Sequence, residues 1–164
     1  MLEMSRPVSN FAPQNNKTGR HGEKTRRPKD KMTRKEYVKA NHLWLAAKIK
    51  EEGVTRLEKG LMYKVLESGD DDAPRPDDDS IVSVHYTGWT IDGKRFDTSR
   101  DEDVPCALRL RDLIEGWIIA LKHMRVGDRW ELYIPAELGY GDMTQPDIPG
   151  GSTLIFDIEL TGVA

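Results

Sequence analysis

The sequence predicts an α+β domain of about a hundred residues, in which antiparallel strands pack on one short central helix. Residues 81–99 contain two strand-like segments joined by an Asp-Gly turn. Residues 129–134 and 154–161 alternate between apolar and polar side chains, which is the period of a half-buried strand. Residues 113–124 carry apolar side chains at helical spacing. A further helix is expected before this domain.

The charge of the chain is unevenly distributed. The 164 residues carry a net charge of −3, yet residues 1–35 hold ten Lys or Arg against three acids, which leaves −10 on residues 36–164. Residues 1–31 also lack apolar periodicity, so they are predicted to be a disordered basic tail. Without interleaved aromatic side chains for base stacking, a solvated arm is favoured, and nucleic acid is not an expected partner.

Composition also excludes some classes of protein. No run of residues is long and apolar enough to span a membrane, so no membrane partner is expected. The first thirty residues lack the apolar segment of an export signal, and we expect a cytoplasmic location. Cys106 is the single cysteine, so the fold does not depend on an internal disulfide.

Residues 32–56 are predicted to form an N-terminal helical segment. Thr33 and Glu36 have the spacing of a capping box, and Gly53 is a natural stop. Tyr37 and Trp44 lie on one apolar stripe of this helix, which therefore needs a partner surface. Packing on the domain's own sheet is favoured over contact with a second copy. The two alternatives correspond to a monomer and a weak homodimer formed through this helix.

Residues 57–164 are expected to form the main domain. Alternation in residues 57–67 predicts a first strand, and the acid- and Pro-rich residues 68–80 predict a loop. In the hairpin that follows, Asp92-Gly93 supplies the turn. Phe96 and Asp97 on its return arm have two interpretations. They are either a core ring followed by a solvated acid or part of a functional site.

The central helix is predicted to start at Asp112, because Asp112 and Glu115 have the spacing of a helix N-terminus, and to end at Gly127. Gly116 inside it costs about 1 kcal/mol relative to Ala, which suggests a close approach by another backbone. Pro135 ends the next strand.

Several enzyme classes are excluded by the residues available. The four His residues are far apart in sequence, without a metal-binding spacing, and no Gly-rich phosphate loop joins a strand to a helix. Neither a metal nor a cofactor is predicted, and Cys106 lacks an activating neighbour. The aromatic residues of separate elements remain, and they could line one apolar concavity beside Asp97. These are Tyr86, Phe96, Trp117, Tyr140 and Phe156. Core packing explains them equally well.

A set of motifs carries a resemblance to a known family. In order along the chain they are VHYTG at 84–88, DGKRFDTSRD at 92–101, LIEGW at 113–117, MRVGDRWELYIP at 124–135, GYG at 139–141 and IPGGSTLIFDIEL at 148–160. Their order and spacing resemble the FK506-binding-protein (FKBP) family of peptidyl-prolyl cis-trans isomerases, from Leu61 to the C-terminus. The preceding helix and residues 53–69 resemble bacterial members related to macrophage infectivity potentiators.

The resemblance implies a twisted antiparallel sheet wrapped around one short helix, with an X-Pro segment bound between them. It implies a peptidyl-prolyl cis-trans isomerase that assists protein folding and needs no cofactor. The expected partners are proline-containing polypeptides and FK506- or rapamycin-type macrocycles. The alternative is a non-catalytic binding or chaperone module that uses the same groove.

The resemblance also assigns residues. Trp117 corresponds to the floor under the proline ring, Tyr86, Phe96, Tyr140 and Phe156 to its walls, and Asp97 to the acid of the pocket. Leu113 and Ile114 correspond to ligand contacts, and Ile148 to the apolar residue over the entrance. His85 is assigned to structure.

Two positions depart from the family. Glu102 stands where better-known members have Arg, which is expected to loosen the hydrogen bonding around Asp97 and Tyr140. Cys106 stands where they have a pocket Phe, which is expected to enlarge the pocket.

Overall fold

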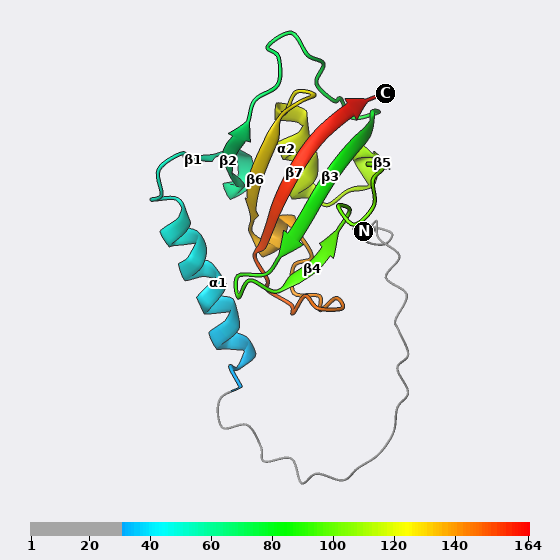
Figure 1. Ribbon diagram of the computed structural model, residues 1–164. Helices are drawn as coiled ribbons and strands as arrows, with labels where there is room; N and C mark the ends of the chain where they lie inside the picture. The colour runs from blue at the N-terminus through cyan, green and yellow to red at the C-terminus, as the bar shows by residue number, and fades with distance from the viewer. Residues whose placement is uncertain (1–30) are drawn as a thin grey trace, which may run out of the picture.

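The structure is a computed structural model that describes residues 31–164. The basic tail predicted for residues 1–31 lies outside this range apart from Lys31. Within residues 31–164 one antiparallel sheet has the strand order β1-β2-β6-β7-β3-β4, and β5 pairs with the start of β3, on the same edge that β4 occupies at its end (Figure 1). The strands are β1 Val54–Arg56, β2 Met62–Glu67, β3 Ile81–Trp89, β4 Arg95–Thr98, β5 Cys106–Arg109, β6 Arg129–Ile134 and β7 Leu154–Val163. The helices are α1 Arg34–Lys48 and α2 Glu115–His123, with short 3-10 turns η1 Glu58–Gly60, η2 Leu110–Asp112 and η3 Ala136–Leu138.

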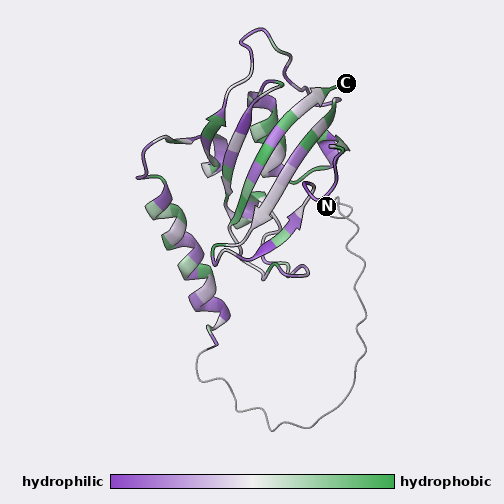
Figure 2. Cartoon of the chain, in the orientation of Figure 1, coloured by the Kyte–Doolittle hydropathy of each residue, from purple (hydrophilic) through white to green (hydrophobic). Residues whose placement is uncertain are grey.

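The core lies between α2 and one face of the sheet. Alternate residues of the long strands, such as Leu132 on β6 and Ile158 on β7, point to this face and are fully buried. Figure 2 shows the alternation as bands of apolar and polar residues along β3 and β7. The predicted fold class, with its antiparallel sheet and single central helix, is therefore confirmed.

The predicted start of α1 is also confirmed. The Thr33 hydroxyl accepts a hydrogen bond from the Glu36 backbone N–H at 3.2 Å, and the Glu36 carboxylate accepts one from the Thr33 N–H at 3.1 Å. This reciprocal pair satisfies two backbone donors that a helix N-terminus otherwise leaves unpaired. The chain leaves the helix through a turn that contains Gly53, whose φ of +82° suits glycine.

The apolar stripe of α1 packs on the chain's own domain, as favoured from the sequence. The Trp44 ring lies 5.7 Å from the ring of Tyr133, a β6 residue on the face of the sheet opposite to α2. The buried Asn41 side chain accepts a hydrogen bond from the Thr153 backbone N–H at 2.7 Å. The Tyr37 and Ser152 hydroxyls are 2.7 Å apart. Together these contacts fix α1 to the segment that enters β7.

Some predicted boundaries around α2 were wrong. The helix begins at Glu115 rather than Asp112, because Asp112 ends the separate turn η2, and it ends at His123, before Gly127. Gly116 does have a close neighbour, but it is a side chain rather than a backbone. A Cβ on Gly116 would lie 2.6 Å from Cγ2 of Ile134. The short strands β1 and β5 were not predicted.

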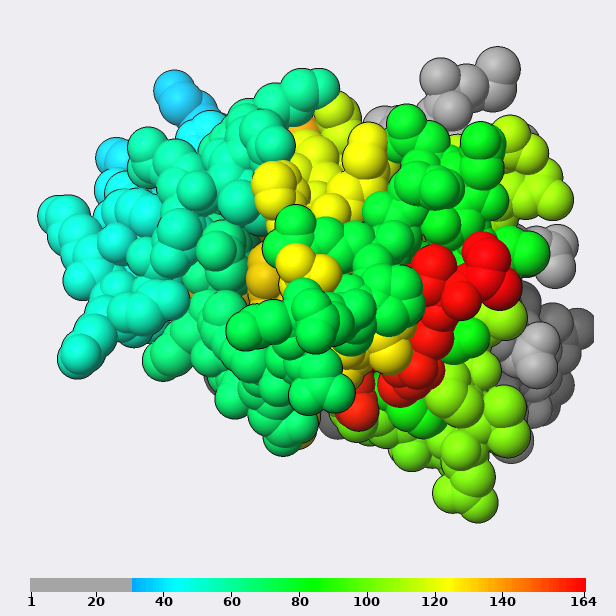
Figure 3. All heavy atoms as spheres, turned by 90° about the horizontal axis from the view of Figure 1, so that it is seen from above, coloured from blue at the N-terminus to red at the C-terminus, as the bar shows by residue number. Residues whose placement is uncertain are grey.

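Residues 68–80 form a loop without strand or helix, as predicted. The loop is fixed to the turn after α2, because the Asp128 carboxylate accepts from the Gly69 N–H at 2.6 Å and the Pro74 carbonyl accepts from the Val126 N–H at 3.0 Å. Figure 3 shows this loop lying across that end of the domain. No helix within residues 31–164 is both long enough and apolar enough to cross a membrane.

Candidate active site

Four aromatic rings from four elements meet on the core face of the sheet. The Trp117 ring from α2 contacts Tyr86 of β3 and Phe156 of β7 edge-on, with centroid distances of 5.0 and 5.1 Å. Phe96 of β4 contacts Phe156 in the same way at 5.5 Å. Edge-on pairs of this kind stabilise a fixed ring arrangement beyond their burial. The structure therefore brings together four of the five aromatic side chains predicted to line a concavity.

Gly88 makes room for two of these rings, and the sequence analysis did not single it out. A Cβ at this position would lie 2.5 Å from Cζ of Phe96 and 2.7 Å from Cε1 of Phe156. Only a residue without a side chain permits this approach. A glycine inside an otherwise regular strand is itself a signal of close packing, and it was available in residues 84–88.

Asp97 lies next to the rings and is bonded to one of them. The Tyr86 hydroxyl donates a 2.7 Å hydrogen bond to Oδ2 of Asp97. Burial raises the pKa of the Tyr86 phenol well above its usual value, and the bond to Asp97 raises it further. The phenol is therefore protonated at neutral pH and acts as the donor. Of the two interpretations of Asp97, the solvated one is excluded, because the residue is 8% exposed.

Tyr140 lies beside this cluster on the segment after η3. Its ring is partly buried and packs against the core. Burial, followed by the nearby Asp97 carboxyl group, raises the pKa of Tyr140 to about 12. Its hydroxyl is therefore neutral under physiological conditions and is able to donate a hydrogen bond.

The three predicted ligand contacts belong to the buried core of the domain, which also contains the four rings. Leu113 and Ile114 lie between η2 and α2, and Ile148 lies on the loop that precedes β7. Leu113 and Ile148 keep 6% and 5% of their surface exposed, whereas Ile114 is fully buried. In this arrangement, Ile114 supports the start of α2 and offers no surface of its own to a ligand.

The Trp117 indole carries an unusual feature. Within the described residues, its Nε1–H is buried and has no hydrogen-bond partner. Leaving a buried donor unpaired costs about 1–3 kcal/mol, so such groups are rare in folded proteins.

The two residues that depart from the family pattern, Glu102 and Cys106, differ in burial. Glu102 is exposed, and its backbone N–H donates to the Ser99 carbonyl at 3.2 Å. Cys106 is partly buried and packs against the buried core. Burial raises the pKa of its thiol, and the carboxylates of Asp97 and Glu102 raise it further. Cys106 is thus a protonated packing residue rather than a nucleophile.

Ser99 is a second residue that the sequence analysis did not single out. Its hydroxyl accepts a hydrogen bond from the Tyr86 backbone N–H at 2.8 Å and lies 3.2 Å from Nδ1 of His85. This contact ties the end of β4 to β3 and agrees with the structural role predicted for His85. Within residues 31–164, no group of three or more His, Cys, Asp or Glu side chains is placed to hold a metal ion.

The chain is similar in sequence to known proteins. The sequence model of the family described as FKBP-type peptidyl-prolyl cis-trans isomerase matches residues 73–161. The isomerase FkpA of Escherichia coli is 46% identical over 114 residues, which cover 70% of this chain and 42% of FkpA. The isomerase Mip of Coxiella burnetii is 38% identical over 121 residues, which cover 73% of this chain and 52% of Mip. This chain thus spans about half the length of these curated relatives.

A solved structure has the same fold. The crystal structure of a peptidyl-prolyl cis-trans isomerase from Pseudomonas syringae superposes with a TM-score of 0.74 at 32% sequence identity. The superposition covers 82% of this chain and 98% of that structure.

Proposed function

This chain belongs to the FKBP-type peptidyl-prolyl cis-trans isomerase family, and we propose that it catalyses rotation about X-Pro bonds of polypeptides and so assists protein folding. The observation that carries the proposal is the closed cluster of Tyr86, Phe96, Trp117 and Phe156 beside the buried Asp97. A core alone does not require a buried acid or an unpaired indole donor at this point.

The reaction needs no nucleophile. Rotation about an X-Pro bond has to overcome a barrier of about 18–20 kcal/mol, because the twisted amide loses its resonance. The planar amide is more polar than the twisted one, so a dry apolar site disfavours the ground state relative to the transition state. Each tenfold acceleration requires about 1.4 kcal/mol of such preference.

The residues then take distinct roles in the proposal. Trp117 supports the proline ring, and the rings of Phe96 and Phe156 exclude water around it. Tyr140, with its neutral hydroxyl, holds the carbonyl oxygen of the residue before proline while the bond turns. Asp97 keeps the Tyr86 ring in place through their hydrogen bond.

The proposal is tested by NMR exchange on a Leu-Pro or Phe-Pro peptide. The protein at micromolar concentration is expected to accelerate isomerisation, and Trp117→Leu is expected to lose at least tenfold in kcat/KM. Trp89→Leu is the matched control, because Trp89 lies outside the ring cluster. This variant is expected to keep the activity of the unaltered protein. An absence of acceleration by the unaltered protein contradicts the enzyme proposal.

We further propose that FK506- and rapamycin-type macrocycles occupy the same pocket and inhibit the reaction. The chain is proposed to be monomeric, because the apolar stripe of α1 already packs on Tyr133 and on the segment before β7. Competition between a macrocycle and the Leu-Pro peptide tests the first proposal. Sedimentation equilibrium at increasing concentration tests the second.

A further inference from the structure

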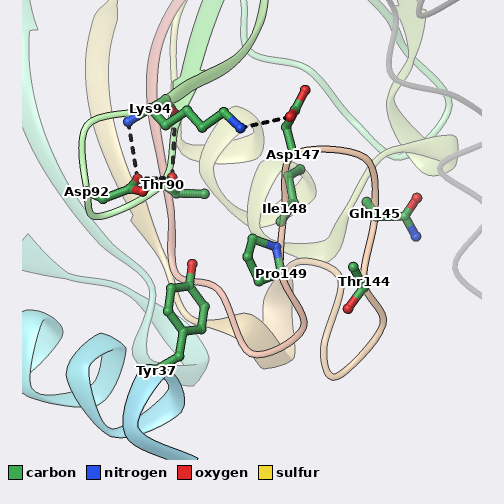
Figure 4. Close-up of a pocket in the computed structure, with 9 residues that line it drawn as sticks. All are labelled: Tyr37, Thr90, Asp92, Lys94, Thr144, Gln145, Asp147, Ile148 and Pro149. Atoms are coloured by element: carbon green, nitrogen blue, oxygen red, sulfur yellow. Dashed lines mark hydrogen bonds and ion pairs between the residues drawn. The ribbon is translucent and has the colours of Figure 1, made fainter. Parts of the chain in front are cut away.

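A cavity of about 260 Å³ lies beside the aromatic cluster, between α1, the β3–β4 turn and the loop before β7 (Figure 4). It is lined by Tyr37, Thr90, Asp92, Lys94, Thr144, Gln145, Asp147, Ile148 and Pro149. Resting on the proposed isomerase function, we propose that this cavity is a second substrate subsite. It binds a Lys or Arg side chain that lies two residues from the proline in an extended polypeptide.

The cavity adjoins the aromatic site through shared structure. Ile148 lines the cavity and also belongs to the buried cluster that contains Trp117 and Phe96. Lys94 also lines the cavity and precedes Phe96 by two positions, so the Cα atoms of these two residues are at most about 7 Å apart. An extended substrate covers about the same distance in two residues. Its residue two positions from the proline therefore reaches the cavity when the proline lies against Phe96.

The lining of the cavity is held in place by specific bonds. The Lys94 ammonium pairs with Oδ1 of Asp147 at 2.9 Å and so joins the β3–β4 turn to the loop. Asp147 has a φ of +63°, a left-handed conformation that L residues rarely adopt. Within the loop, the Thr144 hydroxyl accepts from the Gly150 N–H at 3.1 Å. Strained residues persist where the surrounding structure determines them, and they are concentrated at binding sites.

Helix α1 supplies the remaining side of the cavity. The Tyr37 hydroxyl points toward it in Figure 4, and its contact with Ser152 at 2.7 Å fixes the ring. Without α1 the cavity would lose Tyr37 from its lining.

The charges of the lining favour a cation. The lining holds two carboxylates, those of Asp92 and Asp147, and one ammonium, that of Lys94, which pairs with Asp147. Hydrogen bonds from Thr90 and from the Lys94 backbone N–H lower the pKa of Asp92, so it is ionised at neutral pH. Residues 36–164, with these three charged residues included, carry a net charge of −10. A basic side chain gains from this potential, whereas an acidic one is repelled.

The test uses short Leu-Pro peptides that carry Lys, Ala or Glu two residues before the proline, and a second series with the change two residues after it. Dissociation constants from NMR amide-shift titration and rates from NMR exchange are measured at low salt. In at least one series, we expect Lys to bind about threefold to fivefold more tightly than Ala, and Glu more weakly than Ala. The amide signals of Thr144 and Gln145 are expected to shift with the Lys peptide.

Two variants locate the effect. Asp147→Asn keeps a residue that tolerates the left-handed conformation but removes the charge, so the ratio of Lys to Glu affinities is expected to fall toward one. Asp142→Asn removes the same charge from an exposed carboxylate on the same loop that does not line the cavity, and it is expected to keep the ratio.

Equal affinities of the Lys, Ala and Glu peptides in both series overturn the subsite, as does a preference that survives Asp147→Asn. The outcome for the isomerase function is separate. Tight binding of the Lys peptide without any acceleration of exchange contradicts the proposed catalysis and leaves the subsite standing as a binding site. Acceleration of isomerisation in the Ala peptide, without any preference among the Lys, Ala and Glu peptides, supports the proposed catalysis and overturns the subsite.

Discussion

The Tyr86 phenol donates a 2.7 Å hydrogen bond to Asp97 across the β3–β4 hairpin, and the two residues expose only 2% and 8% of their surface. Removing one partner of such a buried pair lowers the stability of the fold, because the remaining partner stays buried without its hydrogen bond. The pair connects the packing of the hairpin with the chemistry of the pocket.

Replacing Tyr86 by Phe is therefore expected to lower the free energy of unfolding by about 1–3 kcal/mol. It is also expected to reduce kcat/KM, since Asp97 is no longer held. Urea denaturation and peptide exchange measure the two effects. Tyr63→Phe is a suitable control, because Tyr63 stacks on Trp130 away from the site. Full stability and activity in Tyr86→Phe would contradict the role given to the pair.

Gly88→Ala is expected to destabilise the protein by about 1–3 kcal/mol, as overpacking does in well-packed cores. Its methyl group would lie 2.5 Å from Cζ of Phe96, so the ring has to move and activity is expected to fall as well. Gly162→Ala on β7 serves as control, since the nearest atom to its Cβ is 3.6 Å away. The comparison is read from thermal unfolding and from kcat/KM.

Asn41→Ala is expected to release α1 from the segment before β7. The substitution leaves the Thr153 N–H buried without its partner and is expected to cost about 1–3 kcal/mol. Hydrogen exchange at Thr153 is expected to increase. His42→Ala, at the exposed neighbouring position, is expected to change stability by less than about 0.5 kcal/mol. Unchanged exchange in Asn41→Ala would show that the helix is held by other contacts.

Alkaline pH provides a test of the environment of Tyr140. Burial raises its pKa in the folded state to about 12 from an ordinary value of 10.0. The folded state thus binds this proton more tightly than the unfolded chain, and the resulting stability is present below pH 10 and lost between about pH 10 and 12. Tyr140→Phe is expected to lose less stability than the unaltered protein over this interval. Equal losses, measured by urea denaturation at each pH, would place Tyr140 in an ordinary solvated environment.

Local patterns predicted most of the fold. The capping box at Thr33, the turn at Asp92-Gly93 and the alternation of β7 each depend on neighbouring residues alone, and each appears in the structure. The predicted start of α2 at Asp112 was wrong, because that prediction also depended on neighbouring residues alone. Asp112 has the sequence pattern of a helix start, but it is the last residue of the 3-10 turn η2. Packing of the chain at this point determines the conformation, rather than the local sequence.

The candidate site was predictable in part. Its rings come from four elements, and their meeting at Trp117 was inferred from family motifs rather than from any local pattern. The cavity beside the aromatic cluster could not be inferred at all, because Tyr37, Lys94 and Asp147 are brought together only by long-range docking. The residues next to Asp147, such as Ile148, do not predict its left-handed backbone conformation.

The clamp between α1 and the segment before β7 joins residues separated by more than a hundred positions, 112 for Asn41 with Thr153 and 115 for Tyr37 with Ser152. A chain made from its N-terminus completes α1 long before Thr153 leaves the ribosome. Until then the helix lacks the hydrogen-bond partners Ser152 and Thr153. Nascent chains halted before residue 151 are therefore expected to carry α1 without this clamp, held only by contacts such as that of Trp44 with Tyr133.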